Sequence, residues 1–449
     1  MTLLRSVRLV RSLTAISALS AAVACGSSED PGTPAAGGAG ASNVSGAPAL
    51  GGGGSSSGAG NVSGGGAPAA GSGAAPQAGA GGDVAGAATG GAGAGPGAGA
   101  GGAAAGQGGA SAGASGMAGA PAFDGVAVKA IMRRVADYEI ARFGTDNNND
   151  WVRAVFHTGM LAAYRALGDS KYHDYTLNWG KVNNWAIHTS NKGPRFADNQ
   201  TCVQSYAELY QEAPTAPNAV MIAAAQSTYD TMVAAPKAGR VEWYWCDALY
   251  MAPAAMVRVA KATGKTQYTK LMNDMFWDTK DFLYDPKQSL FWRDSSYKNT
   301  NQYWARGNGW VVGGIVRILD DLPADDSHRA DYETLLKEMS SKLRSVQQSD
   351  GFWRSSLTQP AAYTTPETSG TTFFCYAIAW GINHGVLERA TYLPVVSKAW
   401  AALGTAVNAQ GRLGWVQAVG QAPGPSTADA TNDYATGAFL LAGEQVLKL

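Results

Sequence analysis

From residue 123 to residue 449 the chain reads as one helical segment after another. Apolar residues recur every three or four positions, the spacing that gathers them on one face of an α-helix. No stretch sustains the two-residue alternation of a β-strand, although short hairpins around Leu290–Ser296 and Phe352–Ser355 are compatible with the sequence. The pattern predicts twelve helices: Val126–Phe143, Trp151–Leu167, Lys171–Trp185, Gln200–Tyr210, Asn218–Ala235, Asp247–Thr263, Thr266–Leu283, Gly309–Leu322, Ser327–Gln347, Gly370–Val386, Tyr392–Ala406 and Asp433–Leu447.

The twelve predicted helices alternate in composition along the chain. The odd-numbered ones are the more charged, as in Ser327–Gln347 with Lys337 and Glu338. The even-numbered ones carry small and apolar residues, such as the run Trp310–Ile315. Six hairpins closed into a ring, with an apolar inner layer and an amphipathic outer layer, account for both compositions. We therefore predict an all-α (α/α)6 barrel over residues 123–449.

The first 122 residues have a different composition. Arg5, Arg8 and Arg11 precede a short apolar run that ends at Cys25, as in a bacterial lipoprotein signal, and the run is too short for a transmembrane helix. Residues 26–122 are almost entirely Gly, Ala, Ser and Pro, which cannot form a packed core. We expect residues 1–25 to be a signal peptide, Cys25 to be lipidated, and residues 26–122 to be a disordered tether. An ordinary signal peptide in which Cys25 is incidental is the alternative.

The charge balance limits the kinds of partner expected for this chain. Lys plus Arg and Asp plus Glu both number 34, so the net charge is zero and nothing favours a nucleic-acid partner. A membrane is expected only through the lipid anchor of an exported protein.

The wide spacing of Cys202, Cys246 and Cys375 favours buried free thiols over a disulfide framework, although one bridge is compatible with export. The five His residues lack metal-ligand spacing, so we expect no metal and no cofactor.

The loops before the even-numbered helices carry most of the unusual polar and aromatic residues. In a ring of hairpins, every loop that runs from an outer to an inner helix opens at the same end. Helix N-termini meet there too, and their free N–H groups suit an anionic ligand. These loops are residues 146–151, 195–200, 242–247, 304–310, 366–370 and 427–433.

One of these loops ends in a carboxylate among aromatic residues. Asp247 follows Trp243, Tyr244 and Trp245. Desolvation disfavours the charged form of a carboxyl group, so the pKa of Asp247 should rise, as general acid catalysis near neutral pH requires. The aromatic faces suit stacking against a sugar ring. The alternative is that Asp247 only caps the helix that follows.

Two further residues are candidates at the same end. Arg306 sits in a Gly-rich turn between Trp304 and Trp310, and a guanidinium can bind a carboxylate through paired hydrogen bonds. The alternative is an ordinary helix start with Asn308 as its cap. Asp198 is a second carboxylate, and either a catalytic role or an N-cap fits its position.

Four runs together resemble one family of enzymes. They are Trp304–Trp310, Trp245–Pro253, Ala197–Tyr210 and Pro366–Thr371. They look like the unsaturated rhamnogalacturonyl hydrolases (glycoside hydrolase family 105), with the unsaturated glucuronyl hydrolases of family 88 as close kin. The resemblance implies an (α/α)6 barrel without a cofactor.

The resemblance also implies a reaction and a set of residues. The substrate would be an oligosaccharide of lyase-digested pectin with a 4,5-unsaturated galacturonyl residue at its non-reducing end. Asp247 would protonate alkene carbon C4, water would add at C5 with help from Asp198, and the product would open to release the rest of the chain. Where the family has a His-bearing segment, this chain has Leu290–Tyr297 without His, so Arg293 or Asp294 would take over that sugar contact. The remaining implied substrate-binding residues are Trp245, Trp304, Arg306, Asn308 and Trp310.

Two other functions stay open at this point. One is another (α/α)6-barrel glycosidase, acting on saturated or on unsaturated glucuronyl substrates, with Asp247 opposed by Asp198 or Glu367. The other is a surface lipoprotein that binds carbohydrate without cutting it. The aglycone and the oligomeric state are not defined by the sequence.

Overall fold

The computed structural model describes residues 123–144, 146–212 and 214–449. The signal peptide with Cys25 and the tether of residues 26–122 lie outside the described residues. The described residues form fifteen α-helices, α1 to α15, and one two-stranded sheet. None of the helices in this part of the chain is long and apolar enough to span a bilayer.

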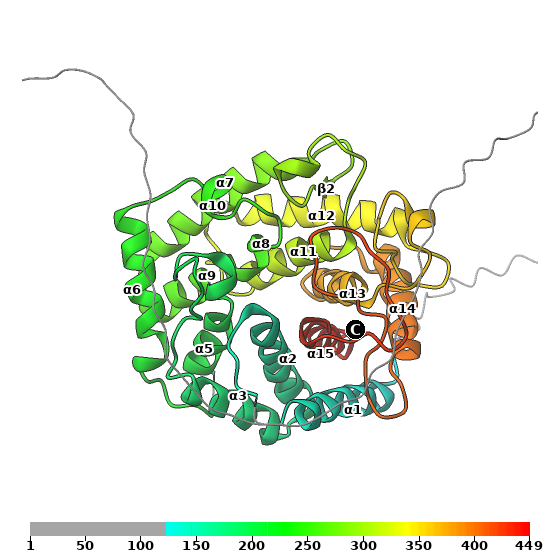
Figure 1. The fold of residues 1–449 in the computed structure, drawn as a ribbon, viewed down its shortest axis with the longest axis horizontal. Helices are drawn as coiled ribbons and strands as arrows, with labels where there is room; N and C mark the ends of the chain where they lie inside the picture. Colours follow the sequence, from blue (N-terminus) through cyan, green and yellow to red (C-terminus); the bar gives the residue numbers. More distant parts are fainter. Residues whose placement is uncertain (1–122, 145, 213) are drawn as a thin grey trace, which may run out of the picture. The chain divides into compact units, whose positions relative to one another are not determined.

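Six helices make up the inner layer of a closed ring (Figure 1). Each contacts the next along the chain, and the last packs against the first. They are α2 (Trp151–Leu167), α5 (Cys202–Gln211), α9 (Pro253–Thr263), α11 (Ala305–Leu319), α13 (Thr368–Asn383) and α15 (Asp433–Val446).

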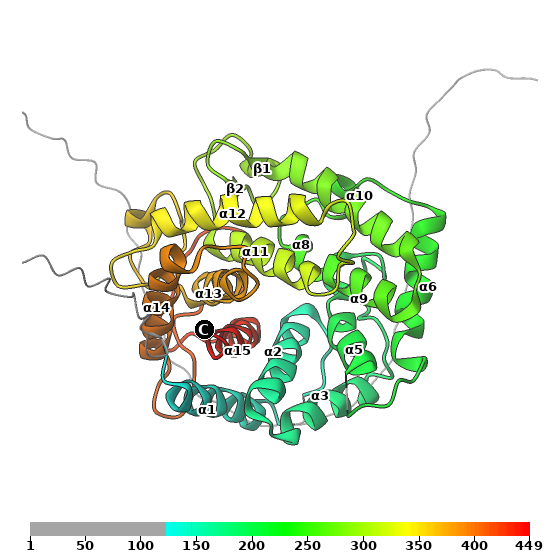
Figure 2. The same ribbon diagram turned by 180° about the vertical axis from the view of Figure 1, so that it is seen from behind.

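Six further helices form the outer layer, as both views show (Figure 2). They are α1 (Gly125–Phe143), α3 (Ser170–Val182), α6 (Val220–Ala234), α10 (Thr266–Leu283), α12 (Arg329–Val346) and α14 (Arg389–Ala406). The predicted (α/α)6 barrel is confirmed.

The composition of the two layers explains their places. Every residue of α11 and of α15 is buried, whereas α12 buries one apolar stripe that includes Tyr332 and Leu336 and exposes its charged residues. The ring closes where Gly159 of α2 meets Gly437 of α15. A Cβ atom on either glycine would collide with the backbone of the facing helix, so only glycine allows this approach.

Two predicted helices are broken in the structure. The predicted helix Asp247–Thr263 is divided into α8 (Ala248–Met251) and α9, because Pro253 has no N–H group to continue the hydrogen-bond ladder. The side-chain amide of Gln204 donates to the carbonyls of Tyr250 and Met251, at 2.8 and 3.1 Å, so these two carbonyls at the break have hydrogen-bond partners. The helix predicted from Gln200 is preceded by α4 (Ala197–Gln200).

Other boundaries differ by a few residues. The helix predicted from Gly309 begins at Ala305, and the one predicted from Gly370 begins at Thr368, so residues assigned to loops lie in first helical turns. A short helix, α7 (Gly239–Glu242), was not predicted. The short 3-10 turns η1 (Ser295–Tyr297) and η2 (Pro360–Ala362) complete the helical elements.

Of the two short hairpins compatible with the sequence, the first lies a few residues earlier than expected, over residues 284–291, and the second is absent from the described residues. Strands β1 (Tyr284–Asp285) and β2 (Leu290–Phe291) pair antiparallel, and an isolated bridge joins Asp294 to Trp245. Around Phe352–Ser355 the described chain has a single bridge, between Trp304 and Ser356, in place of a hairpin. The three predicted thiols Cys202, Cys246 and Cys375 are buried and free, as the sequence predicted.

Candidate active site

A pocket of about 340 Å³ opens at the end of the barrel where the inner helices begin. Trp151 is the first residue of α2, Asp198 lies in α4, Asp247 precedes α8 and Arg306 lies in the first turn of α11. Side chains from different parts of the sequence therefore meet because the inner helices share a direction. The lining is Trp151, Asp198, Trp245, Asp247, Met251, Arg293, Trp304, Arg306, Val419, Gly420 and Gln421.

Asp247 is a buried carboxylate at the floor of this pocket. It is 7% exposed, and within the described residues its side chain makes no capping hydrogen bond to α8. Its Oδ2 lies 3.6 Å from the Cys246 Sγ and 3.7 Å from the Arg293 Nε. Burial raises its pKa above the usual range, while the charges of Arg293 and Arg306 act in the opposite direction. Asp247 thus has the environment of a proton donor rather than of a helix cap.

Asp198 is a second carboxylate in the pocket. It is the second residue of α4, whose N-cap is Phe196, so it is not the N-cap of this helix. Burial, with the charge of Asp247 as a second cause, raises the pKa of Asp198 to about 7. Two carboxyl groups in one poorly solvated pocket resist being ionised together, so the pair retains a proton near neutral pH.

Arg293 supplies a cation beside these carboxyl groups. It follows β2, and its carbonyl accepts from the Cys246 N–H at 2.8 Å, which ties the hairpin to the Asp247 segment. Its Nη1 donates to Asp294 at 2.6 Å. Its Nε is buried and has no hydrogen-bond partner among the residues described. A buried donor without a partner is costly, so this group is suited to an incoming anion.

Arg306 is also in the lining, but its guanidinium is already engaged. It is 1% exposed, and it donates to the carbonyls of Gln417 and Ala418, at 2.6 and 2.7 Å. Its planar group lies over the ring of Trp304, 4.4 Å from the ring centre. The main visible role of Arg306 is therefore to hold the segment at 417–418, which differs from the predicted carboxylate clamp.

Three predicted substrate-binding residues, Asp294, Asn308 and Trp310, lie outside the pocket lining. The carboxylate of Asp294 accepts from Arg293 at 2.6 Å and from the Ser296 N–H at 2.9 Å.

Asn308 bonds to the backbone N–H and carbonyl of Phe291, at 2.8 and 3.1 Å, and so fixes β2 to α11. Trp310 is packed in the core against Tyr250 and Phe373. The helix begins earlier than predicted, and the turn of α11 directs both side chains inward.

Three other residues that the sequence analysis considered for the site, Trp243, Tyr244 and Glu367, are not in the pocket lining. Trp243 is buried in the core, and Tyr244 is exposed at the surface, so only Trp245 of the three aromatic residues lines the site. Glu367 is buried, and its carboxylate accepts from the backbone of Ser369 and Gly370 as the N-cap of α13. Its oxygens are occupied by capping, which does not favour it as an opposed catalytic carboxylate.

The sequence did not indicate Met251 or residues 419–421 as part of the lining. Residues 419–421 belong to the long connection between α14 and α15, which has few charged residues and no helical periodicity. The one sequence feature that could have indicated these residues is that they lie shortly before the loop of residues 427–433, which precedes α15.

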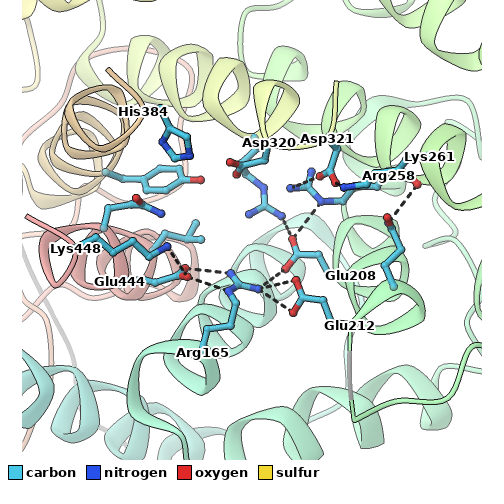
Figure 3. Close-up of a pocket in the computed structure, with 15 residues that line it drawn as sticks. Arg165, Glu208, Glu212, Arg258, Lys261, Asp320, Asp321, His384, Glu444 and Lys448 are labelled. Carbon is cyan, nitrogen blue, oxygen red and sulfur yellow. Dashed lines mark hydrogen bonds and ion pairs between the residues drawn. The ribbon is translucent and has the colours of Figure 1, made fainter. Parts of the chain in front are cut away.

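A second cavity, of about 430 Å³, lies where the inner helices end (Figure 3). Its charged side chains pair with one another rather than leaving groups free for a ligand. Glu208 contacts Arg317, Arg258 and Arg165, and Arg165 also contacts Glu444. This network ties the ends of the inner helices together, and the pocket with Asp198 and Asp247 remains the better candidate for chemistry.

The fold and the site together define a glycan-processing barrel, and comparison with known proteins gives its family. Residues 126–449 match the sequence profile of Glycosyl Hydrolase Family 88. The chain is 36% identical over 323 residues to an unsaturated 3S-rhamnoglycuronyl hydrolase of Formosa agariphila, a match covering 67% of this chain and 85% of that protein. It is 31% identical over 357 residues to an enzyme of the same name from an Alteromonas species, covering 71% and 85%.

A solved structure agrees with these sequence matches. A glycosyl hydrolase family 88 protein from Bacteroides vulgatus superimposes with a TM-score of 0.68 at 31% identity, covering 73% of this chain and 100% of that one. The chain therefore belongs to glycosyl hydrolase family 88 and is a glycoside hydrolase, which confirms the family resemblance and the predicted class of enzyme.

Proposed function

We propose that this enzyme releases a 4,5-unsaturated uronyl residue from the non-reducing end of oligosaccharides in which the next sugar is rhamnose. The observation that carries the proposal is the pocket whose lining brings together Asp247, Asp198, Arg293, Trp245 and Trp304. The names of the relatives from Formosa agariphila and Alteromonas support both the unsaturated uronyl residue and the rhamnose.

The uronic acid itself needs a separate argument. Elimination across C4 and C5 removes both stereocentres, so glucuronate and galacturonate leave the same unsaturated ring and differ only in the linkage at C1. The word glycuronyl in the names of the two relatives covers either uronic acid, so these names support an unsaturated uronyl residue next to rhamnose and do not choose between the glucuronyl linkage and the galacturonyl linkage expected from sequence. We therefore propose a rhamnose-linked unsaturated glycuronyl residue as the substrate.

The proposed reaction begins with proton transfer to the alkene. The substrate carboxylate pairs with Arg293, and the ring lies between the aromatic faces of the pocket. Asp247 donates its proton to C4, and the positive charge that forms at C5 is shared with the ring oxygen. Water adds at C5 and returns a proton to Asp247, with Asp198 orienting the water. The bond from C5 to the ring oxygen then opens to leave a ketone at C5, and the resulting hemiacetal at C1 collapses to an aldehyde and releases rhamnose.

Binding of the substrate also helps to prepare the acid. In the free site, the charge of Arg293 lowers the pKa of Asp247 against the effect of burial. When the substrate carboxylate pairs with Arg293, that charge is compensated, and the pKa of Asp247 rises further. The proton donor is thus most fully protonated when an anionic substrate is in place.

The experiment compares an unsaturated uronyl–rhamnose disaccharide with its saturated counterpart. We expect loss of the alkene's ultraviolet absorbance with the first and no cleavage of the second. In ¹⁸O-water, with immediate reduction to stop carbonyl exchange, the label should appear at C5 and not in the released rhamnose. Label at the anomeric carbon would mean ordinary glycosidic hydrolysis, and binding without product would mean a carbohydrate-binding protein.

A further inference from the structure

The connection between α14 and α15 carries a segment that is fixed at the pocket rim. We call residues 417–424 the rim segment. Figure 1 shows this connection crossing the ends of α11 and α13. Gln417 is its anchor, because its backbone carbonyl accepts from Arg306 at 2.6 Å and from the Tyr434 hydroxyl at 2.6 Å.

The side chain of Gln417 fixes the rest of the rim segment. Its Oε1 accepts from the indole N–H of Trp304 and from the Ser355 hydroxyl, both at 2.8 Å. Its Nε2 donates to the Ala422 carbonyl at 2.7 Å and so closes the segment on itself. Ser355 also accepts from the Gly424 N–H at 2.9 Å. Both ends of the rim segment are therefore held by buried groups.

Between these fixed ends, the rim segment presents an apolar side chain. Val419 is 57% exposed, and it lines the same pocket as Trp304, Asp198 and Asp247. The other exposed valines, such as Val126 on α1, are not part of this lining. An exposed apolar residue on a rigid support at the mouth of a polar pocket is suited to a ligand contact.

We propose that Val419 recognises the methyl group of a 6-deoxyhexose as the leaving sugar. The inference rests on the proposed function, since the charged floor with Arg293 and Asp247 takes the uronyl residue. The leaving sugar then extends toward the open mouth, where the rim segment lies. A 6-deoxyhexose offers a methyl group that Val419 can cover, whereas the corresponding hexose places there a hydroxyl that receives no hydrogen bond from Val419 and loses the apolar contact.

The expected selectivity is modest. One apolar contact of this kind discriminates between substrates by roughly tenfold or somewhat more, and a hydrophobic surface rejects an added hydroxyl to a limited degree. Val419 should therefore shift the ratio of kcat/KM between two leaving sugars rather than decide whether catalysis occurs.

The test uses two disaccharides with the same unsaturated uronyl residue. One has rhamnose as the leaving sugar, and the other has its 6-hydroxylated counterpart. Val419→Thr keeps the shape of the side chain and adds a hydroxyl, so the preference for rhamnose should fall by about tenfold. Val126→Thr, a change of an exposed valine far from the pocket lining, should leave that preference as in the parent. An unchanged preference in Val419→Thr would overturn the proposal.

A binding measurement separates this proposal from the proposed reaction. Methyl rhamnoside should bind the parent more tightly than Val419→Thr in ligand-observed NMR, whether or not any substrate is cleaved. Equal binding by the two proteins would contradict the role of Val419. Selective binding of methyl rhamnoside without cleavage of either disaccharide would support Val419 and refute the proposed reaction.

Discussion

Glu208 should be one of the most important charged residues for stability. It lies in α5, is 5% exposed, and contacts three guanidinium groups, those of Arg317, Arg258 and Arg165 (Figure 3). Although burial acts to raise the pKa of Glu208, the three arginines outweigh it and lower the pKa to about 2. Glu208→Gln keeps the shape of the side chain but leaves these arginines without their shared negative charge.

The magnitude follows from the pKa of Glu208. A fall from the ordinary value of 4.5 to about 2 corresponds to about 3 kcal/mol of unfolding free energy. Removing one partner of a buried ion pair typically costs about 3–5 kcal/mol, which agrees. Because the folded-state pKa lies below the unfolded one, this stabilisation is complete above pH 4.5 and is lost as the pH falls toward 2.

Denaturant unfolding at pH 7 measures the effect, with Glu212→Gln as the matched control. Glu212 contacts the same Arg165, but its side chain is 37% exposed, so its loss should cost no more than about 1 kcal/mol. Glu208→Gln should also lack the part of the parent's acid sensitivity that falls between pH 4.5 and 2. If Glu208→Gln and Glu212→Gln unfold at the same denaturant concentration, the reasoning about the buried network is refuted.

Three further substitutions test the site and the N-terminal region. Arg306→Lys cannot hold the carbonyls at 417 and 418 together, so we expect a loss of about 1–3 kcal/mol of unfolding free energy and a higher KM. An unchanged melting temperature with loss of uronate binding would instead favour Arg306 as the carboxylate clamp. Arg293→Gln removes a cation beside Asp247, whose pKa should rise, so the alkaline limb of kcat/KM should move to higher pH; an unmoved limb would contradict this coupling. We also propose that the protein is exported and lipidated at Cys25, so Cys25→Ser should release it from membrane fractions. An unchanged share of the protein in the membrane fraction would contradict the proposed lipid anchor.

The alternation of charged and apolar helices was sufficient to predict the ring. It reflects burial directly, since a helix such as α11, in which apolar residues and glycines occupy most positions, is expected to lie inside. The break at Pro253 was not predicted, because the apolar spacing continues across it from Leu249 to Met256; the signal for the break is proline itself, which lacks the N–H that a helix interior needs.

The site could be predicted in part. Asp198, Asp247, Trp245 and Trp304 meet in one pocket because the loops that carry them open at one end of the barrel, which follows from topology alone. The partner of Arg306 could not be predicted, because it depends on the path of the rim segment. That path is set by side-chain hydrogen bonds of Gln417 to residues more than sixty positions away, and helical periodicity contains no information about them.

The central claim is that Asp247 donates the proton to the alkene, and Asp247→Asn tests it most directly. The measurement is the rate of loss of alkene absorbance with a saturating unsaturated uronyl–rhamnose disaccharide. Asn matches the size of Asp but cannot donate and reclaim a proton, so the rate should fall by about 10²- to 10⁴-fold while the substrate still binds. A rate within a few-fold of the parent enzyme would contradict the claim.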